Sequence, residues 1–133
     1  MAYSGGKDST YTLRLLIENY QLKVLAITFN HGFISPTAIE NINKVTKHLH
    51  VDHEYVSPQT DTIKEVFVKS LFPNFYPLSA LKRASAVCIS CMNLIKSYLI
   101  KKAIEAKAPL VVYGPEITFY IDNRLYQVKI AVK

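Results

Sequence analysis

A short polar segment near the amino end constrains this chain more than any other feature. It reads Ser-Gly-Gly-Lys-Asp-Ser-Thr over residues 4–10, and an amphipathic helix pattern follows at once. Adjacent glycines let backbone N–H groups approach an anion without an intervening Cβ atom, and successive N–H groups in such a turn form an anion nest. A helix behind the loop would direct its free N–H groups at the same point. The segment therefore predicts a phosphate-binding loop, with further donors from Ser4, Ser9, Thr10 and the ammonium of Lys7.

Two better-known phosphate loops do not fit the spacing. The Walker pattern needs a glycine, four residues and then Gly-Lys-Ser/Thr, whereas Gly5 is followed five positions later by Thr10. The dinucleotide fingerprint needs three spaced glycines, but Gly5 and Gly6 are adjacent and no third glycine follows nearby. The simplest alternative that remains is a glycine-rich turn that only caps a helix.

The segment resembles the signature of the N-type ATP pyrophosphatases, the PP-loop family, whose motif is Ser-Gly-Gly-x-Asp-Ser/Thr. The specified positions all match: Ser4, Gly5, Gly6, Asp8 and Ser9. The resemblance implies an adenine nucleotide α-hydrolase-like fold over roughly residues 2–116. It also implies ATP and AMP as ligands and Mg²⁺ as the accompanying cation. Asp8 would then either coordinate Mg²⁺ with the phosphates or cap the helix.

The composition is typical of one globular domain. The chain has 133 residues, of which 50% are hydrophobic, enough for one moderate core. No apolar run approaches the length needed to cross a bilayer, and no cleavable signal pattern precedes the motif. We therefore expect a cytoplasmic protein without a membrane partner. The formal net charge of +6 comes from scattered lysines that we interpret mostly as solvated helix faces, so charge alone does not predict a nucleic-acid partner.

Very little chain is available for a strand before the loop. A phosphate loop of this kind follows the carboxyl end of a first strand, and only Met1, Ala2 and Tyr3 can supply it. Either this strand is very short or the chain is trimmed. We therefore interpret residues 1–133 as a single PP-loop ATP-binding domain, in a compact or incomplete version.

Hydrophobic periodicity predicts alternating helices and strands. We expect helices over residues 9–20, 36–49, 63–71 and 92–107, strands over 22–29, 51–56 and 110–113, an irregular surface segment over 73–83, and a strand or hairpin over 117–133. This order predicts an α/β fold with a doubly wound parallel sheet. Ligands of such sheets bind at the carboxyl ends of the strands, which selects the loops 4–10, 28–33, 57–59 and 114–116.

Two of these loops carry candidate nucleotide contacts outside the motif. The backbone groups at the end of the second strand would recognise the adenine edge, because a strand end offers a donor and an acceptor; these belong to Ile27, Thr28 and Phe29. His31 could touch ribose or phosphate, or be an ordinary loop histidine. Gly114 and Glu116 follow the last predicted strand, where PP-loop proteins often carry a glycine and polar residues facing the nucleotide. The chain departs there from the commoner Gly-His form.

Cys88 and Cys91 form a Cys-x-x-Cys pair directly before the helix predicted over 92–107. A helix N-terminus lowers a thiol pKa and makes the thiolate more available, so both are candidate catalytic residues. They could instead be buried thiols or a redox disulfide. They could also be half of a zinc or iron–sulfur site, although four ligands are usual and the chain has no third cysteine.

The resemblance implies a common first reaction, in which an acceptor oxygen attacks the α-phosphate of ATP and pyrophosphate leaves. The order of the cysteine pair, helix, strand and Gly114 is similar to PP-loop enzymes that thiolate tRNA, and this favours sulfur transfer through Cys88 or Cys91. Residues 30–33, Asn-His-Gly-Phe, are similar to a segment of the sugar amidotransferases. Amidation of a sugar or small acid is therefore the second hypothesis, and a non-catalytic nucleotide-binding module the third. The corresponding partners are tRNA, a sulfur or ammonia donor protein, and a second copy in a homodimer.

Overall fold

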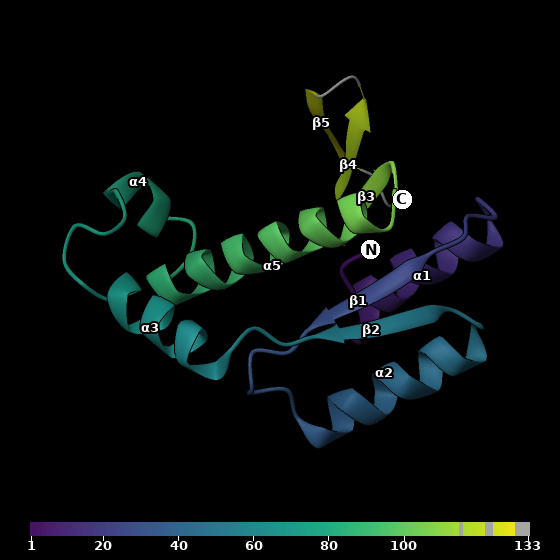
Figure 1. Cartoon of the computed structure of the whole chain (residues 1–133), viewed down its shortest axis with the longest axis horizontal. Coiled ribbons are helices and arrows are strands. Elements are labelled where there is room, and N and C mark those ends of the chain that lie inside the picture. Colours follow the sequence, from purple (N-terminus) through teal and green to yellow (C-terminus); the bar gives the residue numbers. More distant parts are fainter. Residues whose placement is uncertain (115, 122–123, 130–133) are drawn as a thin grey trace.

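The chain folds around one sheet that its first three residues complete. The computed structural model describes residues 1–114, 116–121 and 124–129 and shows an α/β arrangement (Figure 1). The strands are β1 (Leu25–Phe29), β2 (Asp52–Val56), β3 (Leu110–Tyr113), β4 (Glu116–Ile121) and β5 (Arg124–Lys129). Strands β1 and β2 are parallel, and β3, β4 and β5 pair as an antiparallel meander.

The segment 1–3 lies between β1 and β3 and joins the two parts of the sheet. Ala2 forms parallel bridges to Ile27 on one side and Tyr113 on the other. Ala2 N–H donates to Val112 O at 2.8 Å, and Tyr3 N–H donates to Ile27 O at 2.8 Å. The spatial order is therefore β2, β1, segment 1–3, β3, β4, β5. Successive parallel strands are added first to one side of segment 1–3 and then to the other, so the topological switch point lies between this segment and β3.

Helices cover both faces of the sheet, as the sequence predicted. They are α1 (Lys7–Glu18), α2 (Pro36–His48), α3 (Thr60–Ser70), α4 (Leu78–Leu81) and α5 (Ala86–Glu105). One core cluster joins Leu13 and Leu16 of α1 and Ile42 of α2 to Ala26 and Val112 of the sheet. A second cluster joins α5 to the opposite face, and Figure 1 shows α2 and α5 on opposite sides of β1 and β2. Alternate residues of each strand thus enter different cores.

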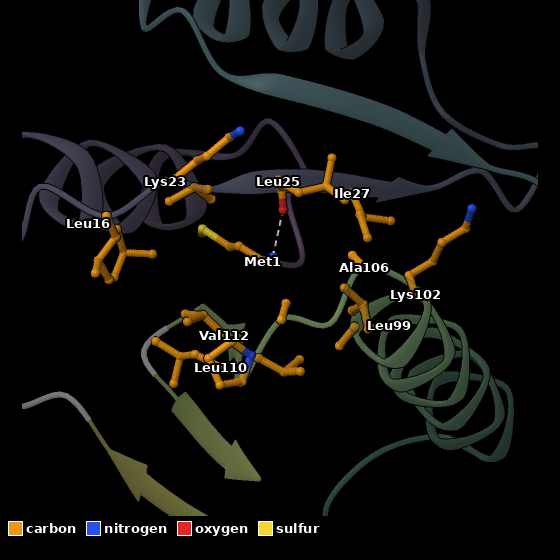
Figure 2. A pocket seen from close by; sticks show the side chains of 16 residues that line it. Met1, Leu16, Lys23, Leu25, Ile27, Leu99, Lys102, Ala106, Leu110 and Val112 are labelled. Atoms are coloured by element: carbon orange, nitrogen blue, oxygen red, sulfur yellow. Dashed lines mark hydrogen bonds between the residues drawn. The ribbon is translucent and has the colours of Figure 1, made fainter.

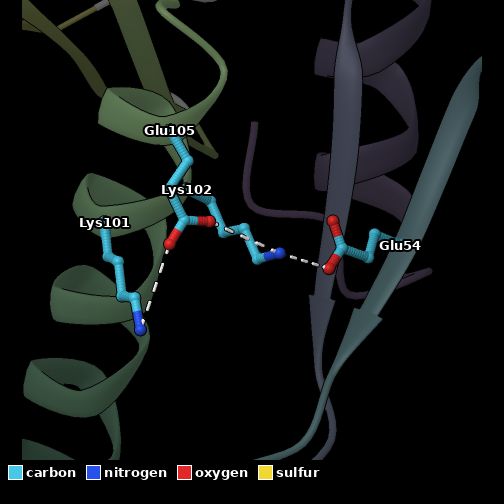
Figure 3. A network of polar contacts seen from close by, with 4 residues as sticks. All are labelled: Glu54, Lys101, Lys102 and Glu105. Atoms are coloured by element: carbon cyan, nitrogen blue, oxygen red, sulfur yellow. Dashed lines mark ion pairs between the residues drawn. The ribbon is translucent and has the colours of Figure 1, made fainter.

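Leu99 and Lys102 hold α5 on the sheet. Leu99 is 3% exposed and packs with residues of β1, β2 and β3. The Lys102 ammonium lies 2.6 Å from Glu54 of β2 and 3.6 Å from Glu105 of its own helix (Figure 3). The hydrogen bond to Glu54 is the main cause that raises the pKa of Lys102. Helix α5 therefore has a defined position relative to the parallel strands.

Several predicted boundaries shift for local reasons. Strand β1 begins at Leu25 rather than residue 22, because Leu22 N–H donates back to Leu16 O at 3.0 Å and closes the end of α1. The segment 73–83, predicted to be irregular, contains the short helix α4. The predicted hairpin in the tail is present as β4 and β5, and it starts at Glu116 rather than 117. Its last predicted residues, 130–133, lie outside the described residues. Across the described part of the chain, every helix is too short or too polar to cross a membrane.

The amino group of Met1 lies in a small apolar pocket of about 190 Å³ at the amino ends of the strands (Figure 2). It donates to Leu25 O at 2.8 Å, which extends the ladder between segment 1–3 and β1. Burial lowers the pKa of this amino group from 8.0 to about 6. The charged form is therefore disfavoured in the folded chain.

The stability of the polypeptide that begins at Met1 should consequently depend on pH. Between pH 6 and 8 the unfolded chain binds more protons at this amine than the folded chain does, so stability rises with pH across this window. The two-unit difference corresponds to about 3 kcal/mol. Urea unfolding at a series of pH values measures it, on protein whose mass confirms that Met1 is present. N-terminal acetylation keeps the donor without the charge, and an acetylated chain with the same pH dependence would contradict this assignment.

Candidate nucleotide-binding site

The loop after segment 1–3 turns sharply because Gly5 adopts a left-handed conformation, with φ of +74°. A Cβ atom at Gly5 would lie 2.5 Å from Ile42 Cγ1, so α2 packs directly against the backbone here. Gly6 is the N-cap of α1, which begins at Lys7. Thr10 N–H makes the first i to i−4 bond, to Gly6 O at 2.9 Å. The N–H groups of residues 7–9 precede that bond and are the donors that a helix end offers to an anion.

Hydroxyl groups within the loop order it internally. Ser9 Oγ donates to Gly6 O at 3.0 Å, and Ser4 Oγ lies 3.1 Å from Ser9 Oγ. Because the Ser9 hydrogen goes to the carbonyl, Ser4 is the donor in that pair. Thr10 Oγ1 is 3.1 Å from the phenol oxygen of the buried Tyr3. In this conformation Ser9 and Thr10 stabilise the loop, and direct donation from either to a phosphate stays a prediction.

A buried polar network lies below the loop. Thr28 Oγ1 donates to Tyr3 O at 2.7 Å and lies 2.8 Å from His53 Nε2. The hydroxyl has one hydrogen, and the Tyr3 carbonyl can only accept, so His53 donates from Nε2. Burial lowers the pKa of His53, which favours its neutral form. The sequence contained no signal for this role of His53, because the contact depends on the register of β1 against β2.

The loop opens into a cleft of about 620 Å³ at the carboxyl ends of the parallel strands. The predicted site residues that line it are Ser4, Asp8, Ser9, Ile27, Thr28, Phe29, His31 and Gly114. Thr10 instead lines a hollow between α1 and α2. Ser57 and Pro58, from the predicted loop 57–59, line a neighbouring cleft of about 520 Å³. His31 and Phe33 border both clefts.

Of the three β1 residues expected to contact adenine through their backbone, only Phe29 has N–H and C=O groups that can face the cleft. Ile27 N–H donates to Met1 O and Ile27 O accepts from Tyr3 N–H, both at 2.8 Å. Residue 27 is therefore already paired, which corrects the expectation that its backbone is available. Thr28 points its backbone groups to the other side, toward β2, because these groups alternate along a strand. The N–H and C=O groups of Phe29 therefore point to the same edge of β1 as those of Ile27. At Phe29 this edge extends beyond the end of segment 1–3.

The segment after β1 is a tight turn stabilised by its own side chains. Gly32 N–H donates to Asn30 Oδ1 at 2.9 Å, and Phe33 N–H donates to His31 Nδ1 at 3.1 Å. The rings of His31 and Phe33 stack with centroids 5.9 Å apart. Nδ1 accepts, so neutral His31 carries its proton on Nε2. Contact of His31 with ribose or phosphate stays a prediction.

Asp8 lies in the first turn of α1, one residue after the helix begins. The N-cap position belongs to Gly6, so the capping role considered for Asp8 is not the one that the structure gives it. Asp8 instead lines the cleft, as Ser4 and Ser9 do. Carboxylate and hydroxyl oxygens are ligands that suit a hard cation such as Mg²⁺, and coordination of Mg²⁺ by Asp8 stays a prediction.

The β3 side of the cleft contains residues that the sequence reasoning missed. Met92, Ile95 and Lys96 of α5 line it, together with Tyr113 and Gly114. From the sequence alone, this lysine is expected on a solvated helix face. The available signal was its spacing, because residues 92, 95, 96 and 99 share one helix face. Glu116 belongs by its backbone to β4, where its register partner is Tyr113.

The cysteine pair lies inside α5 rather than before it. The helix begins at Ala86, and its N-cap Ser85 accepts from Cys88 N–H at 3.2 Å. Cys88 is exposed and Cys91 is half-buried, and they form no disulfide. Burial and the neighbouring Cys88 raise the pKa of Cys91, whereas a position at a helix N-terminus was expected to lower it. Cys91 directly precedes Met92 and Cys88 lies about one helical turn before it, and neither cysteine is among the residues that line the cleft.

The cysteine pair does not fit a complete metal site within the described residues. Among them, no group of three or more His, Cys, Asp or Glu side chains is placed to hold a metal ion. Two thiols supply half of the ligand set of a zinc or iron–sulfur centre. The described residues therefore do not provide such a centre on their own.

Gly5 and Gly6 should respond very differently to alanine substitution. Gly5→Ala places a methyl group against Ile42 and forces an L residue into a left-handed conformation, for an expected loss of about 2–5 kcal/mol in unfolding free energy. Gly6→Ala has an ordinary φ of −77° and meets only Ser4 Oγ at 3.4 Å. Its stability should change by about 0.5 kcal/mol or less. Urea unfolding compares the two variants, and equal losses would show that the loop conformation differs.

The chain is similar in sequence to one protein family and to several known proteins. A family model described as queuosine biosynthesis protein QueC matches residues 1–93. An uncharacterized protein of Methanocaldococcus jannaschii is 30% identical over 122 residues, which cover 90% of this chain and 38% of that protein. The argininosuccinate synthase of Dictyoglomus thermophilum is 30% identical over 125 residues, which cover 86% of this chain and 28% of that enzyme.

The matched region is a minor part of each of these relatives. The chain spans 38% and 28% of the length of the two curated proteins. No solved structure gives a significant match.

Proposed function

Because the chain belongs to the PP-loop family whose model is described as queuosine biosynthesis protein QueC, we propose that it binds ATP and adenylylates an acceptor oxygen, releasing pyrophosphate. One observation carries the proposal. The left-handed Gly5 and the free N–H groups at the start of α1 lie at the switch point of a doubly wound sheet, where such features favour an anion. Ser4, Asp8 and Ser9 of the same loop line a cleft large enough for a nucleotide. The argininosuccinate synthase match, which covers 86% of this chain, supports an ATP-using enzyme.

We infer separate tasks for the loop and for the end of β1. The N–H groups of residues 7–9 and the Lys7 ammonium would hold the pyrophosphate as charge develops on it. Asp8 would hold Mg²⁺, which supplies positive charge to the phosphates when bound. The N–H and C=O of Phe29 would pair with the adenine edge. The apolar side chains of Ile27 and Phe29 would exclude water from the base.

Removal of the Asp8 carboxylate tests the adenylylation step. Asp8→Ala should weaken binding of Mg²⁺–ATP by about tenfold, or about 1.4 kcal/mol, and should abolish acceptor-dependent pyrophosphate release. Isothermal titration with ATP and a coupled pyrophosphate assay measure these effects. Asp61→Ala is a matched control, because Asp61 is an exposed residue in the first turn of α3.

Three outcomes separate the candidate activities. Pyrophosphate release that requires both an acceptor and Asp8 supports adenylylation. Tight AMP binding without turnover, for every acceptor offered, would favour the nucleotide-binding module. No ATP binding by the unmodified chain would remove the basis of the whole proposal.

For the second half-reaction we propose sulfur transfer to a tRNA base, with Cys88 as the sulfur carrier. Cys88 is exposed in the first turn of α5, so a donor protein could reach it. The same helix supplies Met92, Ile95 and Lys96 to the lining of the cleft. The terminal sulfur of a persulfide on Cys88 Sγ would attack the carbon that carries the adenylylated oxygen and displace AMP, leaving the base joined to Cys88 by an S–S bond. An external dithiol would then attack Cys88 Sγ, which releases the thiolated base, and would reduce the resulting mixed disulfide, so that Cys88 is restored as a thiol and the dithiol leaves as its disulfide. The raised pKa of Cys91 does not favour this residue as the thiolate, and thus narrows the role to Cys88.

Amidation with ammonia is the competing second step, favoured by the turn over residues 30–33 that resembles the amidotransferase segment. Incubation with ATP, tRNA and a persulfide donor, followed by mass spectrometry of nucleosides, should give a thionucleoside that Cys88→Ser loses and Cys91→Ser retains in part. Product formed only from ammonia and a small acid, in equal amount with Cys88→Ser, would show amidation and contradict thiolation.

Metal analysis of anaerobically purified protein and of its Cys88→Ala variant tests whether a bound metal centre accompanies the thiol.

A further inference from the structure

Lys96 places a positive charge in the cleft from the side opposite the glycine loop. It is half-buried and lines the cleft with Met92 and Ile95 of the same helix. The neighbouring Lys101 and Lys102 on α5 each have a carboxylate within 4.0 Å. Lys96 makes no such ion pair with any residue that the structure describes. Burying part of an unpaired ammonium costs free energy, and a bound anion would offset this cost.

Contacts with Tyr113 fix where this charge lies. The phenol of Tyr113 donates to Lys96 O at 3.2 Å, which attaches this turn of α5 to the carboxyl end of β3. Lys96 Nζ lies 6.0 Å from the centroid of the Tyr113 ring, within cation–π distance. Leu99, one turn further along α5, anchors the same helix on the sheet. The ammonium is therefore held beside the end of β3, next to Gly114.

With the pyrophosphate at the loop after segment 1–3 and adenine at the end of β1, as proposed above, the α-phosphate would lie between these two positions. Lys96 of α5 and Tyr113 of β3 line the cleft on a third side. We propose that Lys96 binds the α-phosphate of ATP and of the adenylate, whereas Lys7 and the α1 N–H groups bind the β- and γ-phosphates. This inference rests on the proposed function and assigns it a second anion-binding position.

The two positions can be told apart by comparing two nucleotides. ATP and AMP share the α-phosphate, and only ATP carries the β- and γ-phosphates. Lys96→Gln should weaken binding of AMP and of Mg²⁺–ATP by the same factor, about tenfold for one charge-assisted contact. Lys7→Gln should weaken ATP and leave AMP nearly unchanged. Isothermal titration of both nucleotides against both variants gives the four ratios.

Two further variants protect this test against a purely structural effect. Lys101→Gln removes an exposed lysine from another face of α5 and should change neither affinity. Lys96→Arg keeps the charge and should retain most of the AMP affinity, which loss of packing alone would not explain. If Lys96→Gln binds AMP as tightly as the unmodified chain, or weakens ATP alone, the assignment of the α-phosphate is wrong while ATP binding stands. If the unmodified chain binds neither nucleotide, the proposed function itself fails.

Discussion

The backbone hydrogen bonds of residues 1–3 are the interaction on which the rest of the structure depends. Ala2 pairs with β1 on one side and β3 on the other, so it joins the two parts of the sheet. The same pairing places Ser4 at the carboxyl end of the central strand, where the chain must turn into α1. Three residues suffice because a strand paired on both sides satisfies its peptide groups within the sheet. Without this segment, the loop and Gly114 would have no common edge.

Close packing of α2 against the loop is the second constraint. Ile42 is fully buried, and its side chain reaches the position that a Cβ atom on residue 5 would need. The contact with α2 therefore restricts the conformation that the loop can adopt at residue 5. The hydrogen bonds of Ser9 and Thr10 also stabilise this conformation of the loop. Preorganised donors of this kind need no rearrangement when an anion arrives.

The helix and strand order followed from the periodicity, because each amphipathic segment must bury one face. The start of α5 was placed too late, since the segment before Cys88 has little periodic signal and its helix begins at a Ser85 cap. Ile27 was expected to offer its backbone to adenine, but parallel pairing with segment 1–3 uses both groups. His53 and Lys96 were missed because their roles depend on contacts between distant segments.

What the sequence determined by itself is local: a glycine pair that turns the chain, a following helix with free N–H groups, and alternating elements that require a two-faced sheet. These properties depend on conformational preference and on the burial of apolar faces, which short stretches of sequence encode. Only the tertiary structure decided which groups meet in the cleft, and that Met92 and Lys96 of α5 line it whereas Cys88 and Cys91 do not. Strand register and helix position set this arrangement, and both depend on packing between segments up to about a hundred residues apart, such as Ala2 and Tyr113.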